Sequence, residues 1–179
     1  MYSSPPMAAS PSTAPKAGAS AGLDDREEQI AKVHLFQGLR AEALSLVAQV
    51  AVEETHPVGT VIFKHGDIGE KLYVVVDGRV RITREVASGG QGNEEALAIV
   101  GPGDVFGEMA LLDDAPRSAT ARVHERCRLL AIHRDAFEDL LFVHKELAYE
   151  VLWNVVRLMS RRLRETNDRF AMLSFAGKD

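Results

Sequence analysis

The sequence predicts an α+β protein that is mainly β, with its helices at the two ends of the chain. Three observations predict this class. Residues 52–133 consist of short extended runs separated by turns that contain glycine and proline. The segments on either side repeat apolar residues with helical spacing. The length of 179 residues fits one domain of ~100–200 residues with room for a tail, and 46% hydrophobic residues are enough for a core.

Composition excludes several classes of protein. The single cysteine, Cys127, cannot form an internal disulfide or supply the thiolates of an iron–sulfur cluster, and we expect it to be a small buried residue. No apolar run approaches the ~18 residues of a membrane span, and the polar start is unlike a secretory signal, so we expect a cytoplasmic protein. The 21 basic and 26 acidic residues argue against a chain devoted to nucleic-acid phosphates. Six histidines show no i,i+4 pair, so no metal is expected.

The chain opens with residues 1–22, which are rich in proline, serine, alanine and glycine. Such a segment buries too little apolar surface to order itself, so we expect a disordered tail. A docking tail is the alternative. Residues 23–50 predict an N-terminal helical segment. Asp24 and Asp25 suit a helix start, and residues 41–50 repeat apolar side chains with a helical period.

Residues 51–133 are expected to form an antiparallel sandwich or barrel. Six extended runs stand out, at 60–63, 72–76, 79–84, 96–100, 119–123 and 128–132. Asp77 and Gly78 lie between two of these runs. This dipeptide predicts a two-residue hairpin turn, because such turns need positive φ angles that glycine tolerates.

Residues 134–173 predict two C-terminal helices, a short one at 134–142 and a long one from 144 to about 170. The long helix carries a heptad seam that is apolar except at Thr166: Leu152, Val156, Met159, Leu163, Thr166, Phe170 and Leu173. Val151, Val155 and Leu158 form an adjacent apolar stripe. Two stripes favour a homodimer, with one stripe on the β body and the other on a partner. One broad buried face, or docking on the N-terminal segment, is the alternative.

The segment with the clearest chemistry is 106–121. A strand-like run ends at Gly107, and Glu108 begins a stretch that can form one helical turn. Free N–H groups at such a start attract an anion, and glycine lets a ligand approach the backbone. Arg117 follows nine residues after Glu108 and can hold a phosphate through two hydrogen bonds. A ligand with hydroxyl and phosphate groups fits this pair. An ion pair between Glu108 and Arg117 that closes a loop fits the spacing equally well.

The segment resembles the phosphate-binding cassette of the cyclic nucleotide-binding domain family. The shared pattern is Phe106-Gly107-Glu108, a short apolar helix, a loop, and Pro116-Arg117-Ser118-Ala119. Upstream, residues 59–62, 66–69 and 78–80, with Tyr73, fall where the family places the glycines and apolar residues of its β-roll. The resemblance runs from His34 to Leu163. It implies an eight-stranded antiparallel double-stranded β-helix, a jelly-roll-like β-roll, flanked by N-terminal helices and two C-terminal helices.

The resemblance also implies a cyclic nucleotide ligand, cyclic AMP or cyclic GMP, and a role for each matching residue. Glu108 accepts hydrogen bonds from the ribose 2′-hydroxyl, and Arg117 pairs with the equatorial oxygen of the cyclic phosphate. Backbone N–H groups of Met109 or Ala110, and of Ser118 or Ala119, complete the cradle beside Gly107. The Ser118 hydroxyl leaves the choice of base open.

Further residues have a function in the family that the sequence alone does not assign here. Ala98 and Val100 could wall the sugar and base pocket or belong to the core. Family members lower the long C-terminal helix over the base, and Leu158, Arg161 and Arg162 are the candidates for this lid. Four arginines at positions 157, 161, 162 and 164 are expected to be solvated helix charge rather than a nucleic-acid contact.

The output of the protein is expected to pass to a separate effector protein. Only residues 174–179 follow Leu173, so no helix-turn-helix fits and we expect neither direct DNA reading nor membrane contact. The sequence thus predicts a non-enzymatic regulatory module. The alternative is a ligand-independent scaffold or interaction protein that retains the β-roll.

Overall fold

A computed structural model describes residues 22–88, 91–111 and 115–176. The predicted tail therefore lies outside the described residues, apart from Gly22. The helices are α1 (Leu23–Ala31), η1 (His34–Phe36), α2 (Ala41–Val50), η2 (Glu108–Leu111), α3 (Arg134–Val143) and α4 (Lys145–Ala176). The strands are β1 (Ala51–His56), β2 (Val61–Phe63), β3 (Lys71–Ser88), β4 (Gln91–Val100), β5 (Val105–Phe106) and β6 (Thr120–His133).

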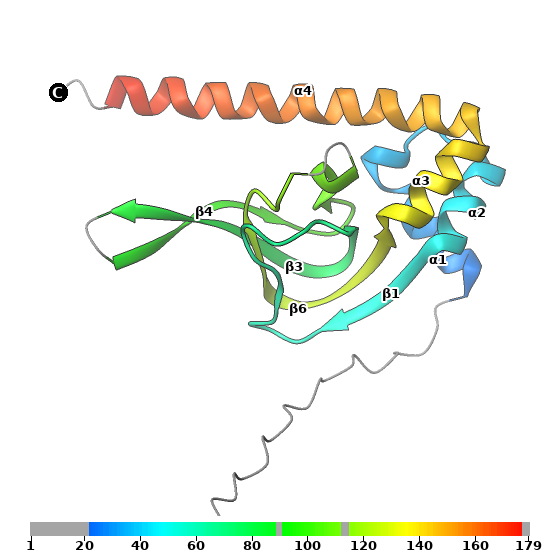
Figure 1. Ribbon diagram of the computed structural model, residues 1–179, viewed down its shortest axis with the longest axis horizontal. Coiled ribbons are helices and arrows are strands. Elements are labelled where there is room, and N and C mark those ends of the chain that lie inside the picture. The colour runs from blue at the N-terminus through cyan, green and yellow to red at the C-terminus, as the bar shows by residue number, and fades with distance from the viewer. Residues whose placement is uncertain (1–21, 89–90, 112–114, 177–179) are drawn as a thin grey trace, which may run out of the picture.

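The strands form one antiparallel sheet that curls into a roll (Figure 1). Its main path is β1-β6-β3-β4, while β2 pairs with β6 and β5 pairs with β3. The predicted α+β class, mainly β, is confirmed. The described residues form six strands rather than the expected eight, because β3 has 18 residues and β6 has 14. Each of these long strands joins two runs that the sequence separates.

The predicted hairpin at Asp77 and Gly78 is wrong. The chain continues through both residues as β3, and β3 pairs with β6 on either side of them. The register shifts there, and Gly78 has a φ of +81°. A Cβ at Gly78 would lie 2.2 Å from the carbonyl oxygen of Arg126. The glycine therefore serves a bulge that bends the strand against its neighbour, not a turn that reverses it.

Two apolar clusters divide the core along the alternation of β3. Leu72 and Val74 face the helices, while Tyr73 and Val75 face the inside of the roll. On β6, Leu130 and Ile132 belong to the cluster on the helix side, and Leu129 and Ala131 belong to the cluster inside the roll. Cys127 belongs to the inner cluster, and burial raises the pKa of its thiol to about 11, so it is a packing residue as expected.

The helices α1, α2 and α3 gather at one end of the roll, and α4 runs along its side (Figure 1). The buried stripe of α4 includes Val151 and Val155, which are 3% and 6% exposed. Between them Asn154 donates hydrogen bonds to the carbonyl oxygens of Leu35 and Gln37 at 3.0 and 2.9 Å. This amide ties α4 to η1, so the start of α4 is fixed on the N-terminal helices. Among the described residues, no helix is long and apolar enough to cross a membrane.

Candidate functional site

A cavity of about 650 Å³ lies between the roll and α4. The roll contributes β4, β5 and the segment around η2, and α4 closes the cavity from the opposite side. Figure 1 shows η2 on the side of the roll that faces α4. The side chains with charge or hydrogen-bonding groups that line it include Glu108, Arg117, Ser118, Arg161, Arg162, Glu165 and Thr166.

Glu108 is a buried carboxylate at the start of η2, only 2% exposed. Strand β5 ends directly before Gly107, whose φ of +73° turns the chain into η2. The Glu108 carboxylate pairs with Nη1 of Arg162 on α4. Arg162 also donates from Nη2 to the carbonyl oxygen of Val105 at 2.9 Å. Arg162 therefore links α4 to both ends of the β5–η2 turn.

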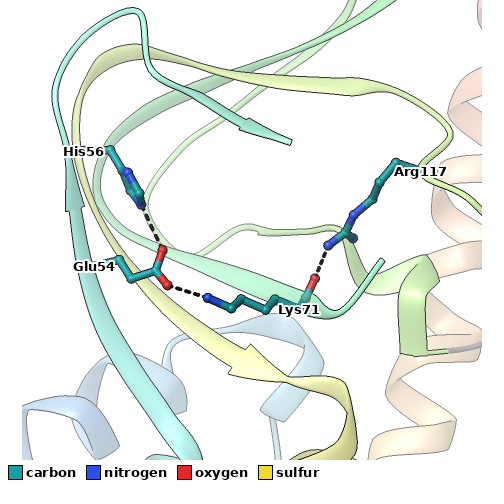
Figure 2. Close-up of polar contacts among 4 residues, drawn as sticks. All are labelled: Glu54, His56, Lys71 and Arg117. Carbon is teal, nitrogen blue, oxygen red and sulfur yellow. Dashed lines mark hydrogen bonds and ion pairs between the residues drawn. The ribbon is translucent and has the colours of Figure 1, made fainter. Parts of the chain in front are cut away.

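Arg117 lies on the same cavity and is 8% exposed. Its Nη1 donates to the carbonyl oxygen of Gly107 at 3.0 Å. Its Nη2 donates to the carbonyl oxygen of Lys71 at 2.7 Å (Figure 2). Burial lowers the pKa of the guanidinium below its usual range, but a guanidinium stays protonated in proteins. Its buried Nε has no hydrogen-bond partner. The cation thus has a fixed orientation and an unused donor.

Gly107 is required by the position of Arg117. A Cβ at this residue would lie 2.7 Å from Nη1 of Arg117 and 3.2 Å from the carbonyl oxygen of Lys71. No side chain fits there without moving the guanidinium. The glycine therefore sets both the turn into η2 and the place of the cation.

Aromatic rings surround the inner side of Arg117. The guanidinium carbon lies 4.1 Å from the centre of the Phe63 ring, a distance at which the ring attracts a cation. Phe63 neighbours Tyr73 and Phe106, and the latter two rings stack at 5.1 Å. Burial, and then the charge of Glu54, raises the pKa of Tyr73 to about 12, so this ring stays neutral.

The structure brings the sequence-predicted site residues together. The same cavity is lined by Gly107, Glu108, Met109, Arg117, Ser118 and Ala119. Ala110 follows Met109 in η2, but its side chain lies outside the described part, as do residues 112–114 of the predicted cassette. The Ser118 hydroxyl donates to the sulfur of Met109 at 3.6 Å.

The alternative ion pair between Glu108 and Arg117 is wrong. Among the described residues, Glu108 pairs with Arg162, and Arg117 is held by two backbone carbonyls. The two groups therefore keep separate partners on one cavity. This separation leaves the carboxylate and the cation able to contact different parts of one ligand.

The candidates for the wall and the lid also meet at the cavity. Ala98 and Val100 line it, together with their neighbours Leu97 and Ile99, so the wall is not confined to one face of β4. The three lid candidates Leu158, Arg161 and Arg162 all line it from α4.

Sequence reasoning missed two contributors to the site. The carbonyl of Lys71 orients Arg117 from 46 residues away, and Phe63 supplies the ring beneath it. A backbone carbonyl leaves no mark on side-chain patterns, so no sequence signal could have found the first. The second lies in a short apolar run that reads as ordinary strand.

The geometry suits a polar ligand that carries an anion. Arg117 brings a positive charge to the cavity, and Glu108 brings a hydrogen-bond acceptor. Within the described segments, no group of histidine, cysteine, aspartate and glutamate side chains could hold a metal ion. Fold and site together define a β-roll ligand-binding domain with an arginine–glutamate site covered by a helix.

The chain belongs to the cyclic nucleotide-binding domain family. The family profile matches residues 53–144, which hold most of the roll, the site residues from Gly107 to Ala119, and α3. The chain is 43% identical over 141 residues to a protein from Thermus thermophilus named cyclic AMP receptor protein, and covers 62% of its length. That match takes in 79% of the present chain.

Solved structures of the same family superpose on the chain. The crystal structure of the Thermus thermophilus catabolite activator protein gives a TM-score of 0.68 at 39% identity, covering 79% of this chain and 63% of that one. The regulatory domain of Toxoplasma gondii PKA, crystallised with cAMP, gives 0.61 at 32% identity, covering 69% of this chain and 46% of that one. The present chain thus spans about three fifths of the length of the Thermus proteins.

Proposed function

We propose that this protein is a non-enzymatic regulatory module that binds a cyclic purine nucleotide, cyclic AMP or cyclic GMP, in the cavity between the roll and α4. Arg117 binds the cyclic phosphate and Glu108 accepts from the ribose 2′-hydroxyl. Backbone N–H groups of Met109 or Ala110, and of Ser118 or Ala119, complete the phosphate site.

One observation carries this proposal: a buried carboxylate and a buried guanidinium with an unused Nε line the same cavity without pairing to each other. In this proposal residues 106–121 are the cassette of a β-roll at 51–133. Residues 134–173 supply the lid and the dimer helix.

Calorimetric titration with cyclic AMP, cyclic GMP and linear AMP, side by side, tests the ligand. We expect at least one cyclic nucleotide to bind more tightly than linear AMP, because the linear phosphate carries a second charge and lacks the ring. Equal binding of the three would reject ring recognition. No binding of any of them would favour the alternative of a ligand-independent scaffold.

Ligand binding is relayed through α4 in this proposal. The contact between Arg162 and Glu108 joins α4 to the residue that would accept the ribose hydroxyl. A ribose that binds Glu108 must share this carboxylate with Arg162 or displace Arg162 from it. Either event changes the contact that keeps α4 against the cavity. The moved helix then alters contact with a separate effector protein.

Replacing Arg162 with alanine should uncouple α4 from the ligand. We expect cyclic AMP to change amide hydrogen exchange along residues 155–170 in the wild type. This change should disappear in the variant, because the ion pair between α4 and Glu108 is lost. Arg157→Ala is the control, since Arg157 lies on the same helix and contacts Asn154 instead. An undiminished exchange response in Arg162→Ala would contradict the relay.

The exposed stripe of α4 supports a homodimer. Leu152, Val156, Leu163 and Phe170 are 58%, 46%, 62% and 72% exposed, and all four belong to the predicted heptad seam. Met159 of the same seam packs on the core instead, and Leu173 has no described side chain. A second copy of the chain would bury these four side chains against their equivalents.

Light scattering at micromolar concentration should give a dimer mass for the wild type and a monomer mass for Leu163→Glu, because a carboxylate in an apolar seam is costly to bury. Arg157→Glu, off the seam, should stay dimeric. A monomeric wild type would remove the dimer from the proposal.

A cytoplasmic location and the lack of direct DNA reading stay predictions, because the chain spans only part of the length of its named relatives.

A further inference from the structure

We infer that the ion pair between Glu54 and Lys71, neither of which lines the ligand cavity, is a positioning device for Arg117. The inference rests on the phosphate-binding role proposed for Arg117. It adds Glu54 and Lys71, two residues outside the cassette, to those that determine the affinity for the cyclic nucleotide.

Lys71 contacts the site through its backbone. Its carbonyl oxygen accepts the shorter of the two hydrogen bonds from the Arg117 guanidinium, at 2.7 Å against 3.0 Å for that of Gly107. Lys71 is the first residue of β3 and pairs with the last residue of β6, His133. The preceding carbonyl, of Glu70, accepts from the backbone N–H of Arg134 at 2.8 Å. Any contact of the Lys71 side chain is a further anchor beyond these backbone contacts.

The Lys71 side chain supplies such an anchor. Its Nζ lies 3.0 Å from Oε1 of Glu54 on β1, and the other carboxylate oxygen accepts from Nε2 of His56 at 3.0 Å. Figure 2 shows the resulting chain of contacts from His56 through Glu54 and Lys71 to Arg117. One residue is therefore held at its ammonium group by Glu54 and at its carbonyl by Arg117.

The pair also spans the sheet. Strands β1 and β3 are not neighbours, because β6 lies between them. Glu54 is opposite Leu129 of β6, and Lys71 is opposite His133. The ion pair thus joins the start of β3 directly to β1. The backbone hydrogen bonds join these two strands only through β6, which lies between them.

The surroundings make this pair stronger than an ordinary surface contact. The Glu54 and Lys71 side chains are 13% and 28% exposed, so water screens their attraction less than at the surface. The hydrogen bond from His56, together with Lys71, holds the pKa of the Glu54 carboxyl below its usual range. Glu54 is therefore charged at neutral pH and available to Lys71.

Loss of the pair releases the Lys71 ammonium and lets the start of β3 shift. Arg117 then loses its better acceptor. We expect Lys71→Met and Glu54→Gln each to weaken cyclic AMP binding by about threefold to tenfold, the range for one lost hydrogen bond. Lys71→Arg keeps the charge and should bind within about twofold of the wild type.

The matched control is Lys32→Met. Lys32 pairs with Glu28 at the end of α1, with side chains 57% and 67% exposed, and neither residue lines the cavity. The same chemical change should there leave affinity unchanged. Equal affinity of Lys71→Met, Glu54→Gln and wild type would overturn the inference, as would an equal loss in Lys71→Met and Lys71→Arg.

A second measurement needs no ligand. Arginine-selective nitrogen NMR of the ligand-free protein should show separate Nη1 and Nη2 signals for Arg117, assigned by their absence in Arg117→Lys, because two carbonyls restrain the guanidinium. Glu54→Gln should merge these signals. If Lys71→Met fails to fold by circular dichroism, the near-isosteric Glu54→Gln carries both measurements. Unchanged signals in Glu54→Gln overturn the positioning role, whereas a wild type that binds no cyclic nucleotide rejects the proposed function instead.

Discussion

Replacing Arg117 with alanine should weaken cyclic nucleotide binding by about 30-fold to about 4,000-fold. The variant removes the Arg117 guanidinium, which lines the cavity together with Glu108. Truncating one partner of a buried charge pair costs ~2–5 kcal/mol, and every ~1.4 kcal/mol is tenfold in affinity. Calorimetric titration of wild type and variant with cyclic AMP measures the change.

Two further variants make this result specific. Arg117→Lys keeps a positive charge, but its three donors sit on one nitrogen and cannot reproduce the planar fork that reaches the carbonyls of Gly107 and Lys71, so we expect an intermediate loss. Arg122→Ala removes a half-buried arginine that donates to the carbonyl oxygen of Gly59 and does not line the cavity, so this variant should bind as the wild type does. Thermal unfolding of each variant separates lost affinity from lost fold. Wild-type affinity in a folded Arg117→Ala protein would sink the assignment of the phosphate site.

Replacing Gly78 with alanine should destabilise the protein by about 2–6 kcal/mol. The residue has a φ of +81°, and a Cβ would meet backbone atoms of Arg126 and Cys127 at 2.2 to 2.8 Å. Backbone strain of this kind costs ~1–3 kcal/mol, and forced overpacking costs another ~1–3 kcal/mol. Urea unfolding followed by circular dichroism gives the difference in the free energy of unfolding.

Gly59→Ala is the matched control for this substitution. Gly59 has nearly the same φ, +85°, but a Cβ there would meet nothing within 4 Å. This variant carries the strain without the clash, so its loss should be the smaller by about 1–3 kcal/mol. Equal losses in the two variants would mean that β3 and β6 do not pack at Gly78 as described.

Local patterns in the sequence predict much of the fold. The helical period of residues 41–50 gives α2 with its observed bounds, and the period after His133 gives α3 and α4. The spacing of Val151 and Val155 predicts a buried stripe, and both residues are buried. The stripe docks on the N-terminal segment through η1, however, which was the alternative to the expected contact with the β body. The correctly predicted features depend on residues a few positions apart, which is the range over which periodicity is visible.

The same local reasoning fails at Asp77 and Gly78. A glycine with positive φ between two alternating runs fits a hairpin turn and a bulge equally well. The backbone of Arg126 and Cys127, nearly fifty residues further along, decides for the bulge because it packs directly against Gly78. Merging two runs into one strand in this way, in β3 and again in β6, lowers the described strand count.

The sequence by itself determined the class of the fold, and it predicted a short group of residues from Gly107 to Ala119 that the structure places on one cavity. Both are encoded in short spacings and side-chain types. Only the tertiary structure decided the partners: Arg162 for Glu108, 54 residues apart, and the carbonyl of Lys71 for Arg117. Several arginines and acceptors could satisfy either group. The partner of each group is decided by how strands and helices that are distant in the chain pack together. A buried charge must be paired, and it pairs with the group that this packing places beside it.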